Sequence, residues 1–268
     1  MAVTSSAIIN VMTAAAQKAG RKLVRDFGEV ENLQVSQKGP ADFVSNADHA
    51  AEKILFKELK KARPNYGFLM EEGGVVEGSD VSNTWVIDPL DGTTNFLHGI
   101  PHFSISIGLM RDGDYYAGVV YSPVHDEMYW AEKGQGGFLN NKRLRVSARK
   151  EMGEGLFATG IPFMKAEGRD HDLFTKQLTQ IMATTSGVRR FGVASLDLAY
   201  VAAGRYDGFW EQGLSAWDIA AGIVLVREAG GFISDFKGGS AIAESNTIVA
   251  ANSSLHVPLL AQLKKAAS

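Results

Sequence analysis

Residues 85–96 of the chain read WVIDPLDGTTNF. The stretch opens on three apolar residues, two of them β-branched, and this pattern predicts a short buried strand. Asp88 stands where the strand should end, and Pro89, which has no N–H to donate, should stop its regular pairing. Asp91 follows closely, so the turn between the two acids can direct both carboxylates to one point.

The second half of the stretch predicts a binding site for an anion. Gly92 lets the backbone approach a ligand closely, and Thr93, Thr94 and Asn95 are suited to the first turn of a short helix. Free N–H groups at the start of a helix bind phosphate. Two hard oxygen ligands would then lie beside an anion site, which is the combination that metal-assisted phosphate chemistry needs. For the Asp-x-x-Asp pair alone, a simple acidic surface turn is the alternative.

Composition narrows the class of protein. The chain has 268 residues, of which 45% are hydrophobic and 21% charged, as expected for a globular enzyme of one large or two small domains. A net charge of -3 gives no support for direct nucleic-acid binding. No run approaches the length of a membrane span, and the N-terminus lacks the basic region of a signal peptide. The absence of cysteine excludes disulfides and zinc–thiolate sites and fits a cytoplasmic location.

The pattern along the chain predicts helices first, then a β-meander, then a mixed second half. Helices are expected at 5–27, 45–62, 169–184, 195–203, 216–229 and 256–266. Strands are expected at 67–70, 85–87, 104–110, 115–121, 127–132, 137–139, 156–159, 206–211, 232–235 and 247–251. Residues 38–41 and 75–84 are expected to be loops. We expect one unit over 1–268, with subdomains 1–150 and 151–268 tightly packed if they exist, because no linker separates them.

Two signature stretches point to a known family. The string DPLDGTTNF at 88–96 resembles the signature of the inositol monophosphatase family, the Mg²⁺-dependent, lithium-sensitive phosphatases. The string WDIAAGIVLVREAGG at 217–231 resembles the second signature of that family, and EEGG at 71–74 matches its acidic pair after a strand. The resemblance covers nearly the whole chain. It implies an α/β (α+β) fold, a layered αβαβα sandwich of the sugar-phosphatase type.

The resemblance implies a metal site made of acidic side chains. Glu71, Asp88 and the Leu90 carbonyl would hold one metal, while Asp88, Asp91 and Asp218 would hold a second; a third would meet Glu71 through water. Two like charges about 4 Å apart repel by about 4 kcal/mol at an effective dielectric of 20, so such a cluster needs cations. Oxygen ligands favour Mg²⁺, with Mn²⁺ possible. Taken alone, Asp218 would be an ordinary acid at a helix N-terminus.

The resemblance also assigns catalytic and substrate-binding roles. The Gly92 and Thr93 amides, beside Thr94, would hold the phosphate. Asp48 would orient the Thr93 hydroxyl and, with Glu71, position the attacking water. The alternative role of Asp48 is the acid of a variant capping box that Ser45 would begin.

Sugar hydroxyls would meet Glu211 and Ala194, with Asp218 close by. The alternative for Glu211 is an exposed charge at a strand end.

The expected function is hydrolysis of inositol 1-phosphate and related sugar or polyol phosphates by metal-activated water, through in-line attack. Fructose 1,6-bisphosphatase activity, or activity on another small phosphomonoester, is the first alternative. The second is a regulatory partner of the transcription machinery, because the pattern is close to the bacterial SuhB-like branch. The resemblance further implies a homodimer.

Overall fold

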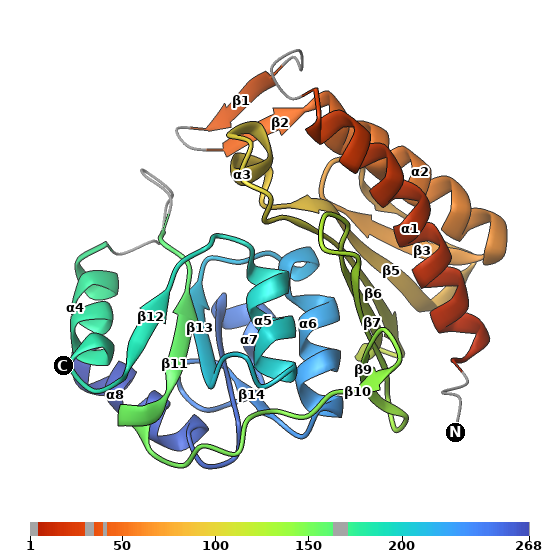
Figure 1. The fold of residues 1–268 in the computed structure, drawn as a ribbon. Helices are drawn as coiled ribbons and strands as arrows, with labels where there is room; N and C mark the ends of the chain where they lie inside the picture. Colours follow the sequence, from red (N-terminus) through yellow and green to blue (C-terminus); the bar gives the residue numbers. More distant parts are fainter. Residues whose placement is uncertain (1–4, 30–34, 40–41, 163–170, 268) are drawn as a thin grey trace.

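The computed structural model describes residues 5–29, 35–39, 42–162 and 171–267, without the side chains of 35–39 and 42–45. The described elements form five layers in the order helices, sheet, helices, sheet, helices (Figure 1). The expected α/β class and the layered αβαβα sandwich are confirmed. Among the described helices, none combines the length and the apolar character needed to span a membrane.

The first layer contains two long helices on the outer face of the larger sheet. They are α1 (Ala7–Phe27) and α2 (Asn46–Ala62), close to the predicted bounds. The side chain of Ser6 caps α1 by accepting a hydrogen bond from the Ile9 N–H. The apolar stripe of α1 is buried, as its helical spacing predicts, and packs against the sheet and α2.

The larger sheet has eight strands and is antiparallel except where β3 and β5 run side by side. From edge to edge, the strands are β10 (Lys142–Arg143), β9 (Gly136–Leu139), β8 (Glu127–Glu132), β7 (Asp114–Ser122), β6 (Ser104–Arg111), β5 (Asp80–Asp91), β3 (Tyr66–Met70) and β4 (Gly74–Val76). The meander expected from 104 to 139 is confirmed.

Three predictions near this sheet were wrong. Residues 75–84, expected to be a loop, include most of β4 and the start of β5, because the edge of β3 pairs with a segment that has no apolar alternation of its own. The central strand does not stop at Asp88 but continues to Asp91, and its register against β6 is irregular between these two acids. Residues 38–39 belong to β1 (Val35–Gly39), which pairs with β2 (Asp42–Ser45); residues 40–41 lie outside the described part.

The middle layer contains α5 (Ala194–Ala202) and α6 (Ala216–Glu228), which lie between the two sheets (Figure 1). Both are buried almost all round, which explains why their sequences are apolar on every side. Helix α6 lies unusually close to β7, because a Cβ at Gly118 would come within 2.5 Å of the Ala221 carbonyl oxygen. Glycine therefore sets the distance between α6 and the sheet.

The smaller sheet has five strands, with α4 (His171–Met182) and α8 (His256–Ala267) on its outer face. Its order is β12 (Gly187–Arg189), β11 (Leu156–Thr159), β13 (Gly208–Gln212), β15 (Thr247–Ala251) and β14 (Phe232–Ser234). The strands and helices predicted for the second half of the chain fall within a few residues of the observed bounds. Residues 169–170 of the helix predicted at 169–184 lie outside the described part. The elements β12, β10, η2 (Met152–Glu154) and α7 (Ile242–Ser245) were not predicted, because each is too short to show a periodic pattern.

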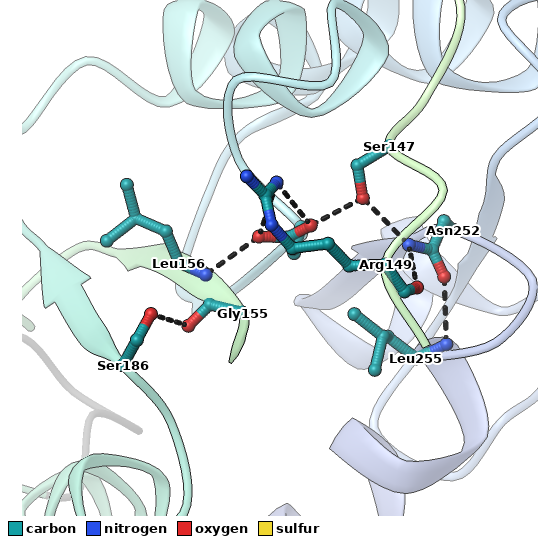
Figure 2. A network of polar contacts seen from close by, with 8 residues as sticks. Ser147, Arg149, Gly155, Leu156, Ser186, Asn252 and Leu255 are labelled. Carbon is teal, nitrogen blue, oxygen red and sulfur yellow. Dashed lines mark hydrogen bonds and ion pairs between the residues drawn. The ribbon is translucent and has the colours of Figure 1, made fainter. Parts of the chain in front are cut away.

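A polar network around the buried Asp207 and Asn252 anchors the segment that connects the two sheets (Figure 2). Asp207 accepts hydrogen bonds from the Ser147 hydroxyl and, at 2.8 Å, from the Leu156 N–H; it also pairs with the Arg149 guanidinium at 3.3 Å. Asn252 donates to Ser147 Oγ at 2.9 Å. These contacts join the connection to β11, to the residue before β13 and to the loop before α8, and so hold it against the smaller sheet.

Candidate active site

Two parallel strands bring the first acids together. The Glu71 N–H donates to the Ile87 carbonyl at 3.2 Å, so Glu71, which follows β3, lies beside the end of β5. Asp88 and Asp91 occupy that end of β5. The Leu90 N–H donates to Asp88 Oδ1 at 2.9 Å across the irregular turn, which holds the Asp88 carboxylate in place. The sequence prediction that these acids point to one region is consistent with this geometry.

Gly92 joins this turn to a short helix, α3 (Thr93–Leu97). Its φ of 95° lies in the left-handed region, and a Cβ there would be 2.8 Å from Val193 Cγ2. The Thr93 hydroxyl lies 2.9 Å from the Leu90 carbonyl and 3.3 Å from Asp48 Oδ2, so its single proton has two acceptors. The capping box expected at Asp48 depends on the Ser45 side chain, which lies outside the described part.

Helix α6 carries Asp218 to the same place. Ser215 begins the helix, and its N–H donates to Asp218 Oδ2 at 2.7 Å in a capping box. The Ser106 hydroxyl donates to the Trp217 carbonyl at 3.1 Å, and Ser106 is the partner of Asp88 in the sheet register. One residue of β6 therefore pairs with Asp88 and also holds the first turn of α6, so the two distant signatures meet.

Helix α5 reaches the site from the other side. The Ser195 N–H donates to Asp91 Oδ2 at 2.7 Å, and the Ala194 N–H and the Ser195 hydroxyl lie close to that carboxylate. Ala194, expected at the substrate, thus lies beside Asp91 through its backbone. Asp88, Asp91 and Asp218 share one feature: a backbone N–H holds one carboxylate oxygen of each.

Burial raises the pKa of three of these acids, and neighbouring carboxylates add to the effect for Asp88 and Asp218. Loss of contact with bulk water raises the pKa of Asp88 well above its ordinary value, and the charges of Glu71, Asp91 and Asp218 add to that effect. Burial, followed by the charge of Asp91, raises the pKa of Asp218 in the same way. Burial raises the pKa of Asp91 to about 6, although hydrogen bonds from Ser195 partly oppose the shift. A bound cation would reverse these shifts, so the chemistry of the donor set fits an oxygen-liganded divalent metal.

These side chains line one cavity of about 480 Å³, which lies within the range of small-molecule sites. All the residues expected at the site line this cavity except Asp48, whose Oδ2 lies 3.3 Å from the Thr93 hydroxyl. The cavity includes Glu71, Asp88, Leu90, Asp91, Gly92, Thr93, Thr94, Ala194, Glu211 and Asp218. A Cβ at Gly160 would come 1.8 Å from Glu211 Oε1, so the Glu211 carboxylate lies directly on the backbone of the loop after β11.

Asp48, Glu71 and Glu72 form a second acidic group beside the cavity. One ligand atom from each lies within 4.8 Å of the other two. Glu72 also lies 3.5 Å from His49 Nδ1, and its N–H donates to Glu52 Oε2 at 2.9 Å. This grouping places Glu71 between the main carboxylate cluster and Asp48.

Sequence analysis missed several residues of the cavity. Arg190 is the only cationic side chain among the described residues that line it, and its guanidinium folds over Gly192, where a Cβ would come within 2.9 Å of Nη1. Asn95 donates to the carbonyls of both His102 and Phe191 and thereby connects α3 to the loop before α5. The position of Arg190, four residues before Ala194, was the only available signal.

Comparison with known proteins agrees with this geometry. The family model described as "Inositol monophosphatase family" matches residues 5–268. The chain is 58% identical over 261 residues to the inositol-1-monophosphatase of Mesorhizobium japonicum, covering 97% of each protein. It is 44% identical over 259 residues to the Nus factor SuhB of Pseudomonas aeruginosa, covering 96% of each.

A solved structure shows the same fold. The extragenic suppressor protein suhB from Bartonella henselae superposes with a TM-score of 0.94 at 55% identity, covering 97% of this chain and 99% of that one. Both signature stretches, the layered fold and the acidic cavity therefore lead to one conclusion: this chain belongs to the inositol monophosphatase family.

Proposed function

We propose that the chain is a Mg²⁺-dependent phosphomonoesterase that hydrolyses inositol 1-phosphate and related sugar or polyol phosphates. The observation that carries the proposal is the meeting of Asp88 and Asp91 with Asp218 in one cavity that also contains the Gly92–Thr94 turn. Acidic oxygens beside an anion-binding turn suit the charge of a phosphoryl group and its metals. The name of the Mesorhizobium japonicum relative, inositol-1-monophosphatase, supports the same substrate.

We assign the cations to the acidic residues of the cavity. Glu71, Asp88 and the Leu90 carbonyl would hold one Mg²⁺, and Asp88, Asp91 and Asp218 would hold a second. A third would be held loosely near Glu71, and Mn²⁺ could replace Mg²⁺. When bound, these ions neutralise the acidic cluster and lower the pKa of water in the site.

The protein groups supply position and hydrogen bonds. The Gly92 and Thr93 amides, beside Thr94, hold the phosphoryl oxygens at the start of α3. Asp48 accepts a hydrogen bond from the Thr93 hydroxyl, which leaves the Thr93 oxygen free to accept a hydrogen bond from the attacking water and to turn the lone pair of that water towards phosphorus. The proton that the water loses on attack is balanced by the proton that the leaving oxygen takes up from solvent. Glu71 helps to orient the same water. Attack opposite the leaving oxygen then cleaves the P–O bond in line, with no covalent intermediate on the protein.

The part of the cavity that is lined by the smaller sheet and α5 would recognise the substrate. Glu211 accepts hydrogen bonds from substrate hydroxyls, the Ala194 backbone borders the ring, and Asp218 lies where ring and phosphate meet. The contact of Glu211 with the Gly160 backbone gives its carboxylate a fixed place on this wall.

The deciding assay compares inositol 1-phosphate with a small panel of phosphomonoesters, in Mg²⁺ and in EDTA. We expect phosphate release that requires Mg²⁺, recovers when Mg²⁺ is restored and is inhibited by millimolar lithium. Full activity in EDTA, or no activity on any panel member with Mg²⁺ present, would contradict the proposal.

A second candidate substrate is a bisphosphate such as fructose 1,6-bisphosphate. Arg190 favours it, because a cation on a cavity with five acidic residues suits a second anionic group far from the reaction centre. Arg190→Gln should then lower kcat/KM for the bisphosphate but not for inositol 1-phosphate. The matched control is Arg189→Gln, since Arg189 is exposed and does not line the cavity.

We also propose that the protein is a cytoplasmic homodimer. Ile100 and Phe191 are 47% and 44% exposed, and Asn95 holds their two segments together, so they form one apolar surface suited to a second copy. Light scattering at micromolar concentration should give the dimer mass. The name of the relative Nus factor SuhB supports a further role as a transcription partner, which co-purification with the transcription machinery would test.

A further inference from the structure

Asp91 is held differently from the other two aspartates of the cavity. Asp88 and Asp218 accept backbone N–H groups from residues two and three positions away, Leu90 and Ser215. These contacts form whenever the local turn or helix forms. The N–H that donates to Asp91 comes from Ser195, which is 104 residues away in α5. The orientation of Asp91 therefore depends on how α5 docks against the end of β5.

A buried serine pair lies behind this contact. The Ser104 and Ser195 hydroxyl oxygens are 2.8 Å apart, and both residues are fully buried. Ser104 is also the partner of Asp91 in the register of β5 and β6. The strand that pairs with Asp91 thus provides the hydroxyl that touches the residue holding Asp91.

The hydrogen bond between the two serines holds the first turn of α5 against β6. Either hydroxyl can donate in this pair. Because Ser195 lies in that first turn, the same contact fixes the position of its backbone N–H, which donates to Asp91 Oδ2. The serine pair therefore holds in place the donor that orients Asp91.

We propose that Ser195 is a positioning residue for Asp91, supported by Ser104, and that this pair sets the affinity of the site for its divalent cation. The inference rests on the proposed function, because it takes Asp91 to be a metal ligand. Groups that orient metal ligands typically account for 10- to 100-fold in metal affinity or activity. The alternative is that the two serines only satisfy each other in the interior.

The test uses Ser195→Ala, Ser104→Ala and the double variant, with Ser122→Ala as the control. Ser122 is also fully buried in the larger sheet, but its hydroxyl contacts His125 instead of the site. Two readouts are needed: Mn²⁺ binding to substrate-free protein by calorimetry, and the Mg²⁺ concentration for half-maximal phosphate release. Thermal melting in EDTA reports the structural cost separately.

We expect Ser195→Ala to weaken Mn²⁺ binding by about 10- to 100-fold, and Ser104→Ala by less. Ser195→Thr, which keeps the hydroxyl, should restore much of the affinity. The double variant separates the alternatives: it leaves no buried hydroxyl without a partner, so its melting temperature should recover relative to Ser195→Ala while its Mn²⁺ affinity stays low. Ser122→Ala should bind Mn²⁺ within about twofold of the unmodified chain.

Mn²⁺ affinity within twofold of the unmodified chain in both Ser195→Ala and the double variant would overturn the inference. So would recovery of affinity together with melting temperature in the double variant. Failure of the proposed function looks different, because the unmodified chain itself would then bind no Mn²⁺ and release no phosphate.

Discussion

One side of the cavity is built by a short stretch of chain, and the other is assembled from distant segments. On the first side, the end of β5 and the turn after it supply Asp88, Leu90, Asp91 and the Gly92–Thr94 segment within a few residues. On the second side, α5, α6, β13 and the loop after β11 each supply one to three residues. Apart from the contact of Asp91 with Ser195, the first side is fixed by local backbone geometry, whereas the second is fixed by packing between sheets. We infer that the first side sets what chemistry is possible and the second sets how well it works.

Removal of Asp218, the single acid that the second side gives to the metal-binding cluster, should have the largest effect. Asp218→Asn keeps the size of the side chain and an oxygen that can accept the Ser215 N–H, so the helix cap should survive at a cost near or below about 1 kcal/mol. We expect kcat to fall by about a hundredfold or more, and the Mg²⁺ requirement to rise. In EDTA the melting temperature should stay the same or increase, because one like charge has left the cluster.

Asp235→Asn is the matched control for that variant. Asp235 is also buried and accepts backbone N–H groups, from Lys237 and Gly239, but it does not line the cavity. It should lose stability without any change in the Mg²⁺ titration. Near-normal kcat and an unchanged Mg²⁺ titration in Asp218→Asn would place Asp218 outside the site.

Glu211→Gln should separate substrate recognition from metal binding. A hydrogen bond to a charged group contributes about 1.5 to 3 kcal/mol, or about 10- to 150-fold in kcat/KM. We expect that loss for inositol 1-phosphate and little loss for 4-nitrophenyl phosphate, with the Mg²⁺ requirement unchanged. Glu154→Gln, at an exposed site, provides the control. Equal losses on both substrates would show that Glu211 does not recognise hydroxyls.

The two sides also differ in how much of them the sequence predicts. Asp88, Asp91 and Gly92 are contiguous, so the first side could be proposed from the string alone, although Pro89 was wrongly expected to end the strand. The strand continues because its register slips between Asp88 and Asp91, which spares Pro89 a ladder hydrogen bond. Propensity alone does not show such a slip.

The roles of residues on the second side depend on contacts between distant segments, so the sequence alone does not reveal them. Ser106 is an ordinary strand serine until the register places it opposite Asp88 and under the first turn of α6. Gly118 and Ser104 likewise acquire a role only once α5 and α6 are packed on the sheet. Arg190 reaches the cavity by folding over Gly192, and no local pattern encodes that path.

Acidic pH should weaken cation binding on the first side, because Asp91 becomes protonated. Its folded-state pKa of about 6 exceeds the ordinary value of about 3.9, so below pH 6 a proton competes with the cation. The Mg²⁺ requirement should therefore rise about tenfold per pH unit below that point, by the stoichiometry of one proton. Because the raised pKa favours the protonated folded state, the metal-free protein should lose stability as pH rises from about 4 to 6.

Mg²⁺ activation curves from pH 5 to 8, and melting curves in EDTA over the lower range, would check both signs. A Mg²⁺ requirement that stays constant between pH 5 and 7 would contradict the raised pKa of Asp91.

The smallest expected effect concerns the packing that brings the two sides together. Gly118→Ala would place a Cβ 2.5 Å from the Ala221 carbonyl oxygen, and backbone atoms cannot rotate away. We expect a loss of about 1 to 3 kcal/mol in the free energy of unfolding, with a modest rise in the Mg²⁺ requirement as α6 shifts. Gly153→Ala is the control, since a Cβ there meets nothing within 4 Å. Unchanged stability in Gly118→Ala would mean that α6 is not held at this distance.

The two sides of the cavity should meet around divalent cations. Crystals grown with Mn²⁺ and measured at a wavelength where manganese scatters anomalously would test it most directly. We predict anomalous peaks in the cavity, with at least one between Asp88, Asp91 and Asp218 and another near Glu71. Peaks confined to the group of Asp48, Glu71 and Glu72, or no peak in the cavity at saturating Mn²⁺, would contradict this arrangement.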